Sequence, residues 1–391
     1  MEFLLASVGG LALLGLALGG VLIRKKNMHI WLPDYLRRKI KGHSTVKGPI
    51  HIMFCFVDHY EPQWENRDNI EKERARVDRW CRDYPKNFSH IKDADGCMPK
   101  HTFFYPEEEY REEHLSKLAD LCSQGFGELD IHLHHHDDTA ENLKETLEGF
   151  AKTLHEQHGG LPVHPKTNKP SYAFIHGNWT LDNSDPHGRF CGVKNELVVL
   201  KETGCYADFT LPSAPNPAQT RKVNAIYYAT GNPDKSKSHD TGTDVEVGVP
   251  SSGDLMIIQG PLGFNWKKRK FGFMPGIENG DIKRTTPPSK HRVDNWVSKH
   301  VHVKGKPEWV FVKIHTHGTQ ENDMDTLLGE PTVSMYEYLA SKYNDGEKYV
   351  MHFVSSREMF NIIKAAEAGE SGNPGSYRDY FLGRPKNCLS S

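Results

Sequence analysis

The stretch from Glu128 to Asp138 constrains the fold of this chain more than any other part of the sequence. Its hydrophobic residues alternate with polar ones, which is the pattern of a β-strand with one face in a hydrophobic core. The strand then runs into four histidines and two aspartates, namely His132, His134, His135, His136, Asp137 and Asp138. Because neutral imidazole is the commonest metal ligand in proteins, the stretch predicts a metal site at the tip of a strand.

Which of these side chains bind the metal depends on the path of the chain. His132 and His134 share one face of a strand, whereas His136 can join His132 if the chain turns over at the strand end. Three protein ligands and one open position are typical of a hydrolytic metal site. A solvated histidine-rich loop is the alternative, but such tracts are usually low in complexity and this one lies between two predicted helices.

The overall composition narrows the classes of protein and partner. Lys and Arg total 49 and Asp and Glu total 51, which gives a formal net charge of −2 and no indication of nucleic-acid binding. The 23 histidines cluster at positions 132–136, 300–302 and 315–317, and this clustering favours metal chemistry. The seven cysteines form no CxxC pair, so they suit reduced thiols and a reducing compartment.

The N-terminal segment predicts a membrane anchor. Phe3 to Ile23 contains no charged residue, and at about 1.5 Å per residue it is long enough to span a hydrocarbon core of about 30 Å. Residues 1–23 are therefore expected to form one transmembrane helix. Basic residues crowd positions 24–47, so the positive-inside rule places the rest of the chain in the cytoplasm and this segment at the lipid headgroups. A periplasmic or extracellular domain is the alternative.

Predicted strands and helices alternate over residues 48–366. Strands are expected at 51–57, 101–105, 129–133, 172–175, 206–209, 225–229, 255–258, 309–314 and 349–354. Helices are expected at 68–83, 107–123, 139–154, 196–203, 333–343 and 357–366. This alternation predicts βα units, and hence an α/β fold with a parallel sheet or barrel. The residues 367–391, rich in Gly, Ser and Pro, are expected to form a flexible tail.

Four of these strands, the histidine strand among them, end in side chains suited to catalysis. The first runs into Asp58, His59 and Glu61, the strand at 172–175 runs into residues 176–179, and the strand at 309–314 runs into residues 315–317. In α/β folds the carboxyl ends of the parallel strands carry the chemistry, so these groups are expected to meet. A loop turn, with Asp58 capping the next helix, is the alternative for the first group.

Taken in order, these strand ends resemble the motifs of the polysaccharide deacetylase (NodB-like) superfamily over residues 48–366. The resemblance implies an irregular, often seven-stranded (β/α) barrel, and metal-dependent removal of N-acetyl or O-acetyl groups from sugars. The histidine strand matches the family's second motif most closely, which implies His132 and His136 as metal ligands. His134 and Asp137 are further candidates in the same stretch.

Two other motifs match by position and order. Asp58 takes the place of the family's general base, and His59 replaces the second aspartate, which is a metal ligand in the family. Asp58 and Glu61 are the alternative ligands. His315 takes the place of the general acid that follows a late strand, with His317 as its rival.

The family's third motif normally carries an arginine, and none occurs in residues 174–179. His176, Asn178 and Trp179 are expected to bind the substrate there, with Asn178 donating to the oxyanion and Trp179 stacking on a sugar ring. A loop asparagine and a core tryptophan are the alternatives.

These inferences together predict a membrane-anchored, metal-dependent hydrolase that removes an acyl group from an amino sugar or a lipid-linked glycan precursor. Zinc is the expected cofactor, because it suits histidine-rich tetrahedral sites, with nickel and cobalt as alternatives. Two other functions stay open. One is a phosphoesterase or amidohydrolase with two or three metals, and the other is a carbohydrate-binding scaffold whose catalytic residues have decayed.

Overall fold

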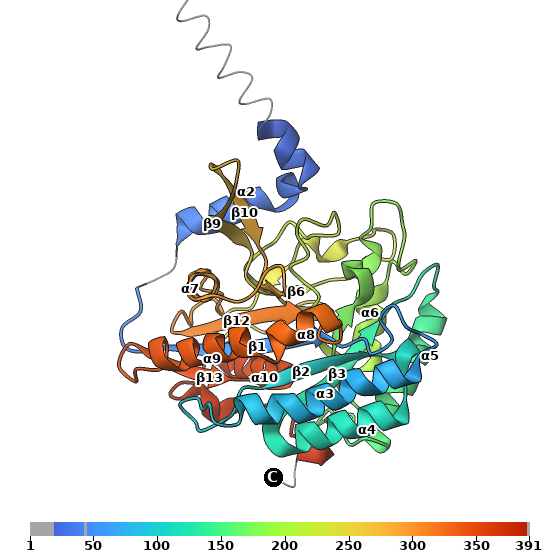
Figure 1. The fold of residues 1–391 in the computed structure, drawn as a ribbon. Helices are drawn as coiled ribbons and strands as arrows, with labels where there is room; N and C mark the ends of the chain where they lie inside the picture. The colour runs from blue at the N-terminus through green and yellow to red at the C-terminus, as the bar shows by residue number, and fades with distance from the viewer. Residues whose placement is uncertain (1–18, 43–44, 389–391) are drawn as a thin grey trace, which may run out of the picture.

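The computed structural model describes residues 19–42 and 45–388, and they form an α/β fold around a mostly parallel central sheet (Figure 1). The sheet has eleven strands: β1 (Ile50–His59), β2 (His101–Pro106), β3 (Gly127–Leu133), β4 (Tyr172–His176), β5 (Cys205–Asp208), β6 (Ile226–Ala229), β7 (Thr243–Asp244), β8 (Leu255–Ile258), β11 (Asp281–Ile282), β12 (Trp309–Thr316) and β13 (Tyr349–Phe353). The predicted α/β class is therefore confirmed.

Helices connect most of these strands. They are α2 (Met28–Lys41), α3 (Ile70–Phe88), α4 (Glu112–Leu121), α5 (Ala140–Glu156), α6 (Glu196–Thr203), α7 (Lys290–Val297), α8 (Glu321–Leu327), α9 (Glu330–Lys342) and α10 (Ser356–Ala368). The side chain of Thr139 caps α5 by accepting a hydrogen bond from N of Asn142, as expected from its position before an apolar periodic run. The sequence patterns did not predict α2, α7 or α8.

The strand order across the sheet is β11-β12-β1-β2-β3-β4-β5-β8-β6-β7, and β13 also pairs with β1. The pairings are parallel except those of β6 with β8 and with β7, which are antiparallel. Within the described residues the edge strands β11 and β7 do not pair with each other, so the sheet is open and does not close into a barrel. After β5 and β8 the sheet continues with the antiparallel strands β6 and β7 and not with β12.

The open sheet is nevertheless curled. Four strands lie between β12 and β5, yet Nζ of Lys313 on β12 donates hydrogen bonds of 2.7 Å to the carbonyl oxygens of Phe209 and Leu211, which follow β5. The carbonyl of Leu211 also accepts a hydrogen bond from N of Gly260, just after β8. The concave face of the sheet is therefore bridged by a lysine side chain rather than by a complete ladder.

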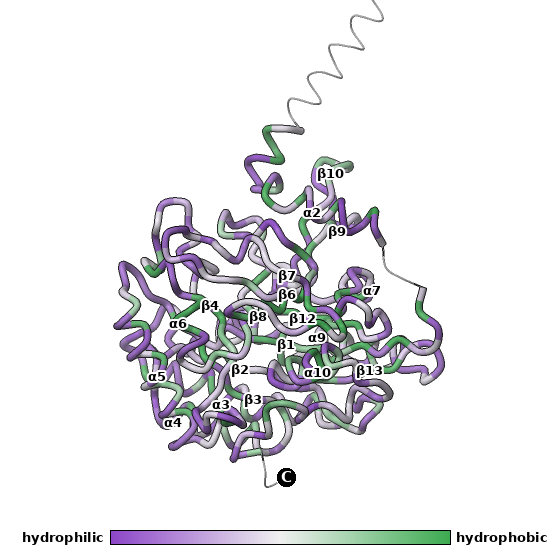
Figure 2. Tube along the Cα trace, turned by 180° about the vertical axis from the view of Figure 1, so that it is seen from behind, coloured by the Kyte–Doolittle hydropathy of each residue, from purple (hydrophilic) through white to green (hydrophobic). Residues whose placement is uncertain are grey.

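The two faces of β1 pack against different helices. Ile52, Phe54 and Phe56 belong to the large hydrophobic cluster that includes α3, α4, α5 and α9. Cys55 and Val57 belong to a second cluster on the concave face, which includes α10. Figure 2 shows the hydrophobic residues concentrated along these strands, inside a hydrophilic outer surface. Because successive strand residues point to opposite faces, this division decides which strand-end side chains can meet.

No helix within residues 19–42 and 45–388 is both long enough and apolar enough to cross a membrane. The predicted span from Phe3 to Ile23 lies mostly outside the described residues, which begin at Gly19.

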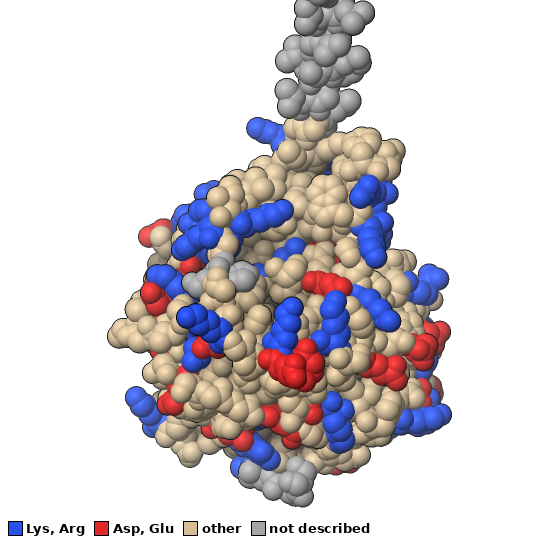
Figure 3. All heavy atoms as spheres, turned by 90° about the vertical axis from the view of Figure 1, so that its left-hand side faces the viewer, with Lys and Arg blue, Asp and Glu red and all other residues tan. Residues whose placement is uncertain are grey.

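The predicted basic segment contains helix α2, which packs onto a hairpin of β9 (Gly263–Lys270) and β10 (Met274–Glu278). The buried ring of Trp31 on α2 lies 5.5 Å from the ring of Phe264 on β9. The tip of the hairpin is exposed and carries Phe271 and Phe273. Figure 3 shows Lys and Arg side chains gathered at this end of the molecule.

Residues 367–388 are packed against the rest of the fold, whereas residues 367–391 were predicted to form a flexible tail. The guanidinium of Arg378 forms ion pairs of 3.0 Å with Asp93, 2.9 Å with Asp95 and 3.1 Å with Glu358. Leu382 is fully buried. The Gly- and Pro-rich composition suggested a tail, but these charged and apolar anchors fix the segment.

Candidate metal centre

Side chains from the ends of β1, β3 and β12 meet on the concave face of the sheet. His59 continues the row of Cys55 and Val57 on β1, and its ring centroid lies 4.9 Å from that of His132. The ring of His317, just after β12, stacks on His59 at 4.6 Å. The structure thus brings together strand ends that lie far apart in the sequence.

Three of the side chains in this group have the geometry of a metal site. The ligand atoms of Glu61, His132 and His134 all lie within 4.8 Å of one another. Oε1 of Glu61 lies 3.7 Å from Nε2 of His132 and 3.1 Å from Nε2 of His134. Ligands about 2.1 Å from a tetrahedral zinc ion are about 3.4 Å apart, so these distances suit such an ion. We refer to these three residues as the triad.

The far nitrogen of each triad histidine is held by a hydrogen-bond acceptor. Nδ1 of His132 lies 2.7 Å from the carbonyl oxygen of Ile175, and Nδ1 of His134 lies 2.6 Å from Oε1 of Glu108. Acceptors at Nδ1 place the proton there, so each neutral ring presents the lone pair of Nε2. Metal-binding histidines are oriented in this way by carbonyls and carboxylates.

Two buried atoms of the triad lack partners. Within the part of the chain that the structure describes, Nε2 of His132 and Oε2 of Glu61 form no hydrogen bond. Both atoms are acceptors, and buried acceptors without partners are rare because they lose their hydration. A divalent cation would satisfy both, and the two-histidine, one-carboxylate set leaves coordination positions open for water or substrate.

Comparison of the sequence with protein-family models and with curated proteins gave no match.

The electrostatics of the triad keep its carboxylate charged. Burial opposes ionisation, but the neighbouring imidazoles of His132 and His134 hold the pKa of Glu61 below its ordinary value. Burial also opposes the charge on His134, yet its hydrogen bonds with Glu108 and Glu61 raise the pKa of His134 to about 10, so a bound metal ion would displace a proton from its Nε2. His59 behaves in the opposite way, because burial and then the neighbouring imidazole of His317 hold its pKa well below the ordinary range. Glu61 therefore offers a negative charge to a cation, and His59 a neutral ring.

Asp58, the predicted general base, does not reach this group. It lies on the opposite, helix-covered face of β1, where Oδ2 is 2.8 Å from Nε2 of His101 and Oδ1 accepts a hydrogen bond of 2.6 Å from N of Gly318. Strand alternation is the reason, since His59 and Asp58 are neighbours and point to opposite faces. The structure therefore does not bring the side chains of Asp58 and His59 together at one site.

His136 and Asp137, two of the predicted ligands, also lie apart from the triad. The side chain of His136 is 54% exposed, and its Nδ1 accepts a hydrogen bond from N of Phe190. Asp137 is exposed and has a φ of 50°. Strand β3 keeps its direction to Leu133, so His134, two residues after His132, still reaches the concave face. His136, four residues after His132, does not.

The two candidate acids after β12 have different surroundings. His315 is buried, and burial lowers its pKa to about 3. His317 is partly exposed, and its ring centroid lies 6.1 Å from that of Trp179. Trp179 also lies 6.4 Å from the ring of His59. His317 and Trp179 therefore line the accessible side of the histidine group.

The remaining predicted residues are divided between surface and interior. Asn178 is exposed, with a left-handed φ of 54°. His176 is buried in a separate cluster with His135. Glu108, which orients His134, was not predicted. The acidic run after Pro106, at a strand end beside the histidine strand, was the signal that could have indicated it.

Proposed function

We propose that this protein is a metal-dependent hydrolase that removes an acyl group, above all acetyl, from a sugar or a lipid-linked glycan precursor. The observation that carries the proposal is the triad of Glu61, His132 and His134, whose unpartnered acceptor atoms converge at the carboxyl ends of parallel strands. The acyl and sugar specificity rests on the resemblance to polysaccharide deacetylases. The curled open sheet is compatible with the irregular barrel of that family.

The chain's own residues can then be given roles. A divalent metal held by the triad would supply a water of lowered pKa and polarise the acyl oxygen. The ring of His59 is adjacent to His132, so it is placed to accept the proton from the attacking water. His317 is partly exposed and can protonate the leaving amine or alkoxide, a role that the depressed pKa of His315 disfavours. Trp179 offers a ring face for a sugar.

We also propose that the enzyme works at a membrane surface. The uncharged run from Phe3 to Ile23 precedes α2, and α2 packs against the β9–β10 hairpin. The hairpin tip exposes 81% of Phe271 and 72% of Phe273 and carries the basic run Lys267–Lys270. Exposed aromatic rings beside lysines are typical of segments that sit at the lipid headgroups. From β10 the chain passes to β11, which pairs with His315 on β12, so the hairpin base lies close to the histidine group.

The experiment is a paired measurement of metal content and acyl hydrolysis on the purified full chain in detergent. Wild type should release acetate from acetylated amino sugars or from an aryl acetate. Glu61→Gln and His134→Ala should lose metal from the triad and lower hydrolysis by at least about 100-fold, in line with the loss of an essential metal ligand. His136→Ala is the matched control, because it removes a neighbouring exposed histidine.

Two outcomes would overturn the proposal. Cleavage of an aryl phosphate diester without any release of acetate would identify a phosphoesterase. Saturable binding of acetylated sugars by the metal-loaded chain, with no turnover, would identify a carbohydrate-binding scaffold.

A further inference from the structure

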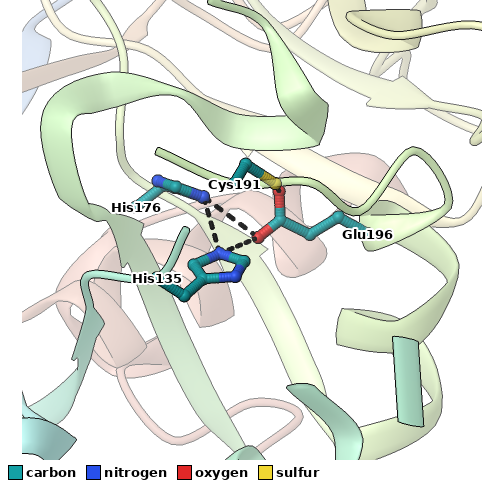
Figure 4. Close-up of side chains that lie close together, drawn as sticks. All are labelled: His135, His176, Cys191 and Glu196. Carbon is teal, nitrogen blue, oxygen red and sulfur yellow. Dashed lines mark hydrogen bonds and ion pairs between the residues drawn. The ribbon is translucent and has the colours of Figure 1, made fainter. Parts of the chain in front are cut away.

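A second cluster of side chains, separate from the triad, contains His135, His176, Cys191 and Glu196 (Figure 4). We propose that it binds a structural metal ion of the zinc class, which ties the loop before α6 to the ends of β3 and β4. None of its residues belongs to the triad. The cluster is therefore assigned an ion of its own.

The ligand atoms are spaced as they are around a tetrahedral ion. Nε2 of His135 lies 2.8 Å from Nε2 of His176 and 3.2 Å from Oε1 of Glu196, and Nε2 of His176 lies 3.3 Å from the same oxygen. Sγ of Cys191 lies 3.4 Å from Oε2 of Glu196. Figure 4 shows the two imidazole nitrogens and the carboxylate pointing toward one another. Tetrahedral zinc ligands are about 3.4 Å apart, close to these values.

The hydrogen bonds of His135 and His176 indicate which ring nitrogens carry the protons. Nδ1 of His135 lies 2.9 Å from Oδ2 of Asp138, and Nδ1 of His176 lies 2.6 Å from the carbonyl oxygen of Gly177. Both partners are acceptors, so the protons of the neutral rings are on Nδ1 and both Nε2 atoms present lone pairs. Two lone pairs and a carboxylate oxygen then face one point. Such an arrangement is repulsive unless a proton or a metal ion lies at that point.

The side chains of this cluster are shielded from solvent, which makes an uncompensated charge costly. Glu196, His176 and Cys191 are fully buried. Within the described part of the chain, the only ion-pair partners of Glu196 are His135 and His176, and no lysine or arginine reaches it. A buried carboxylate requires a compensating positive charge, because moving it out of water is costly. A bound divalent cation provides this charge and also uses the thiolate of Cys191.

A third group of possible ligands provides a contrast. Asp93, Asp95 and His352 also lie together, but the guanidinium of Arg378 forms ion pairs with both aspartates at 3.0 and 2.9 Å. Nε2 of His352 lies 2.9 Å from Nδ1 of His51. The protein itself neutralises that group, so we assign no metal to it.

The ion would organise a loop that reaches the proposed catalytic site. Residues 177–195 connect His176 to Glu196 and include Trp179, which lies beside His59 and His317. Oε2 of Glu196 accepts a hydrogen bond of 2.5 Å from N of Asp182 in this loop. The same loop, through residues 183–188, lines a groove of about 480 Å³ next to α2. A metal ion at this cluster would therefore fix the position of the loop that lines both the groove and the site around His59 and His317.

Cobalt substitution of the full chain tests the proposal, because the triad contains no cysteine. Cobalt bound at the second cluster should give a thiolate-to-metal charge-transfer band in the near ultraviolet, and Cys191→Ser should lose it. Glu61→Gln should keep the band, which separates this proposal from the proposed function. His135→Ala should contain one metal equivalent less than wild type, whereas His136→Ala should contain the wild-type amount.

Two results would overturn it. The first is wild-type protein that takes up cobalt without a thiolate band. The second is an unchanged metal content in His135→Ala. Limited proteolysis within residues 181–196 gives a structural readout that does not depend on activity, because chelation should expose this loop in wild type. If His135→Ala does not fold, the cobalt spectrum of wild type and of the milder Cys191→Ser variant still decides the question.

Discussion

Oδ2 of Asp58 lies 2.8 Å from Nε2 of His101, on the helix-covered face of the sheet. The other carboxylate oxygen accepts a hydrogen bond from N of Gly318, immediately after His317. The ring of Trp80 lies 4.6 Å from that of His101, and its Nε1 donates to the carbonyl oxygen of Gly318. Asp58 is therefore part of a buried network that fixes the turn carrying His317.

Asp58→Asn is expected to lower the free energy of unfolding by about 2 kcal/mol, because an amide replaces a buried acceptor of two hydrogen bonds. Its metal content should match that of wild type, since Asp58 lies outside the triad. Urea denaturation and elemental analysis of the same samples measure the two quantities. A variant of normal stability that has lost its metal would show that Asp58 acts at the metal site after all.

Gly177→Ala is expected to weaken metal binding at the triad. A Cβ atom at this position would overlap the ring of His134 and lie 2.7 Å from the carbonyl oxygen of Leu133, so the imidazole must move. Displacement of one oriented ligand typically costs about 10- to 100-fold in metal affinity, which a competition titration with a chelating dye measures. Gly149→Ala is the matched control. It lies in α5 with open space around it, so it should keep the affinity and gain about 0.5–1 kcal/mol of stability.

Lys313→Met is expected to change how stability depends on pH. Burial lowers the pKa of Lys313 to about 7, whereas an unfolded lysine titrates near about 10.4. Between these values the unfolded chain binds the proton and the folded chain does not, so the free energy of unfolding rises with pH. The contribution of Lys313 is at most about 1.4 kcal/mol per pH unit.

Urea denaturation of wild type and Lys313→Met from pH 6 to pH 9 checks this sign. The variant should lose the part of the slope that belongs to Lys313. The variant should also be less stable than wild type at pH 9. Methionine cannot replace the hydrogen bonds that Nζ of Lys313 donates to the carbonyl oxygens of Phe209 and Leu211. Lys152→Met on the exposed side of α5 is the control. Parallel pH profiles for wild type and Lys313→Met would contradict the prediction.

The β9–β10 hairpin is expected to be protected by anionic lipid. Hydrogen exchange of residues 263–278 in the full chain should be slower in nanodiscs that contain anionic lipid than in neutral ones, because basic and aromatic side chains both favour a charged interface. The double variant Phe271→Ser/Phe273→Ser should lose most of this protection. The loop at residues 232–237 serves as an internal reference. Equal exchange in both lipids would place the hairpin away from the membrane.

The sequence by itself determined the α/β class and the strand ends at which side chains meet. The nearly all-apolar run from His51 to Val57 predicted a buried parallel strand, and β1 does pair in parallel with β2, β12 and β13. The alternation of Leu129, Ile131 and Leu133 with polar residues predicted the histidine strand. These features depend on local periodicity, which is present in the sequence before any long-range contact forms.

Only the tertiary structure decided how the histidines are divided. His134 and His135 are neighbours that point to opposite sides, so one joins Glu61 and the other joins Glu196. Their partners Glu108 and Cys191 come from loops whose positions depend on packing between distant elements. The curl of the sheet likewise depends on Lys313 reaching across it to the chain after β5. Such contacts join residues far apart in the chain, and no local pattern specifies them.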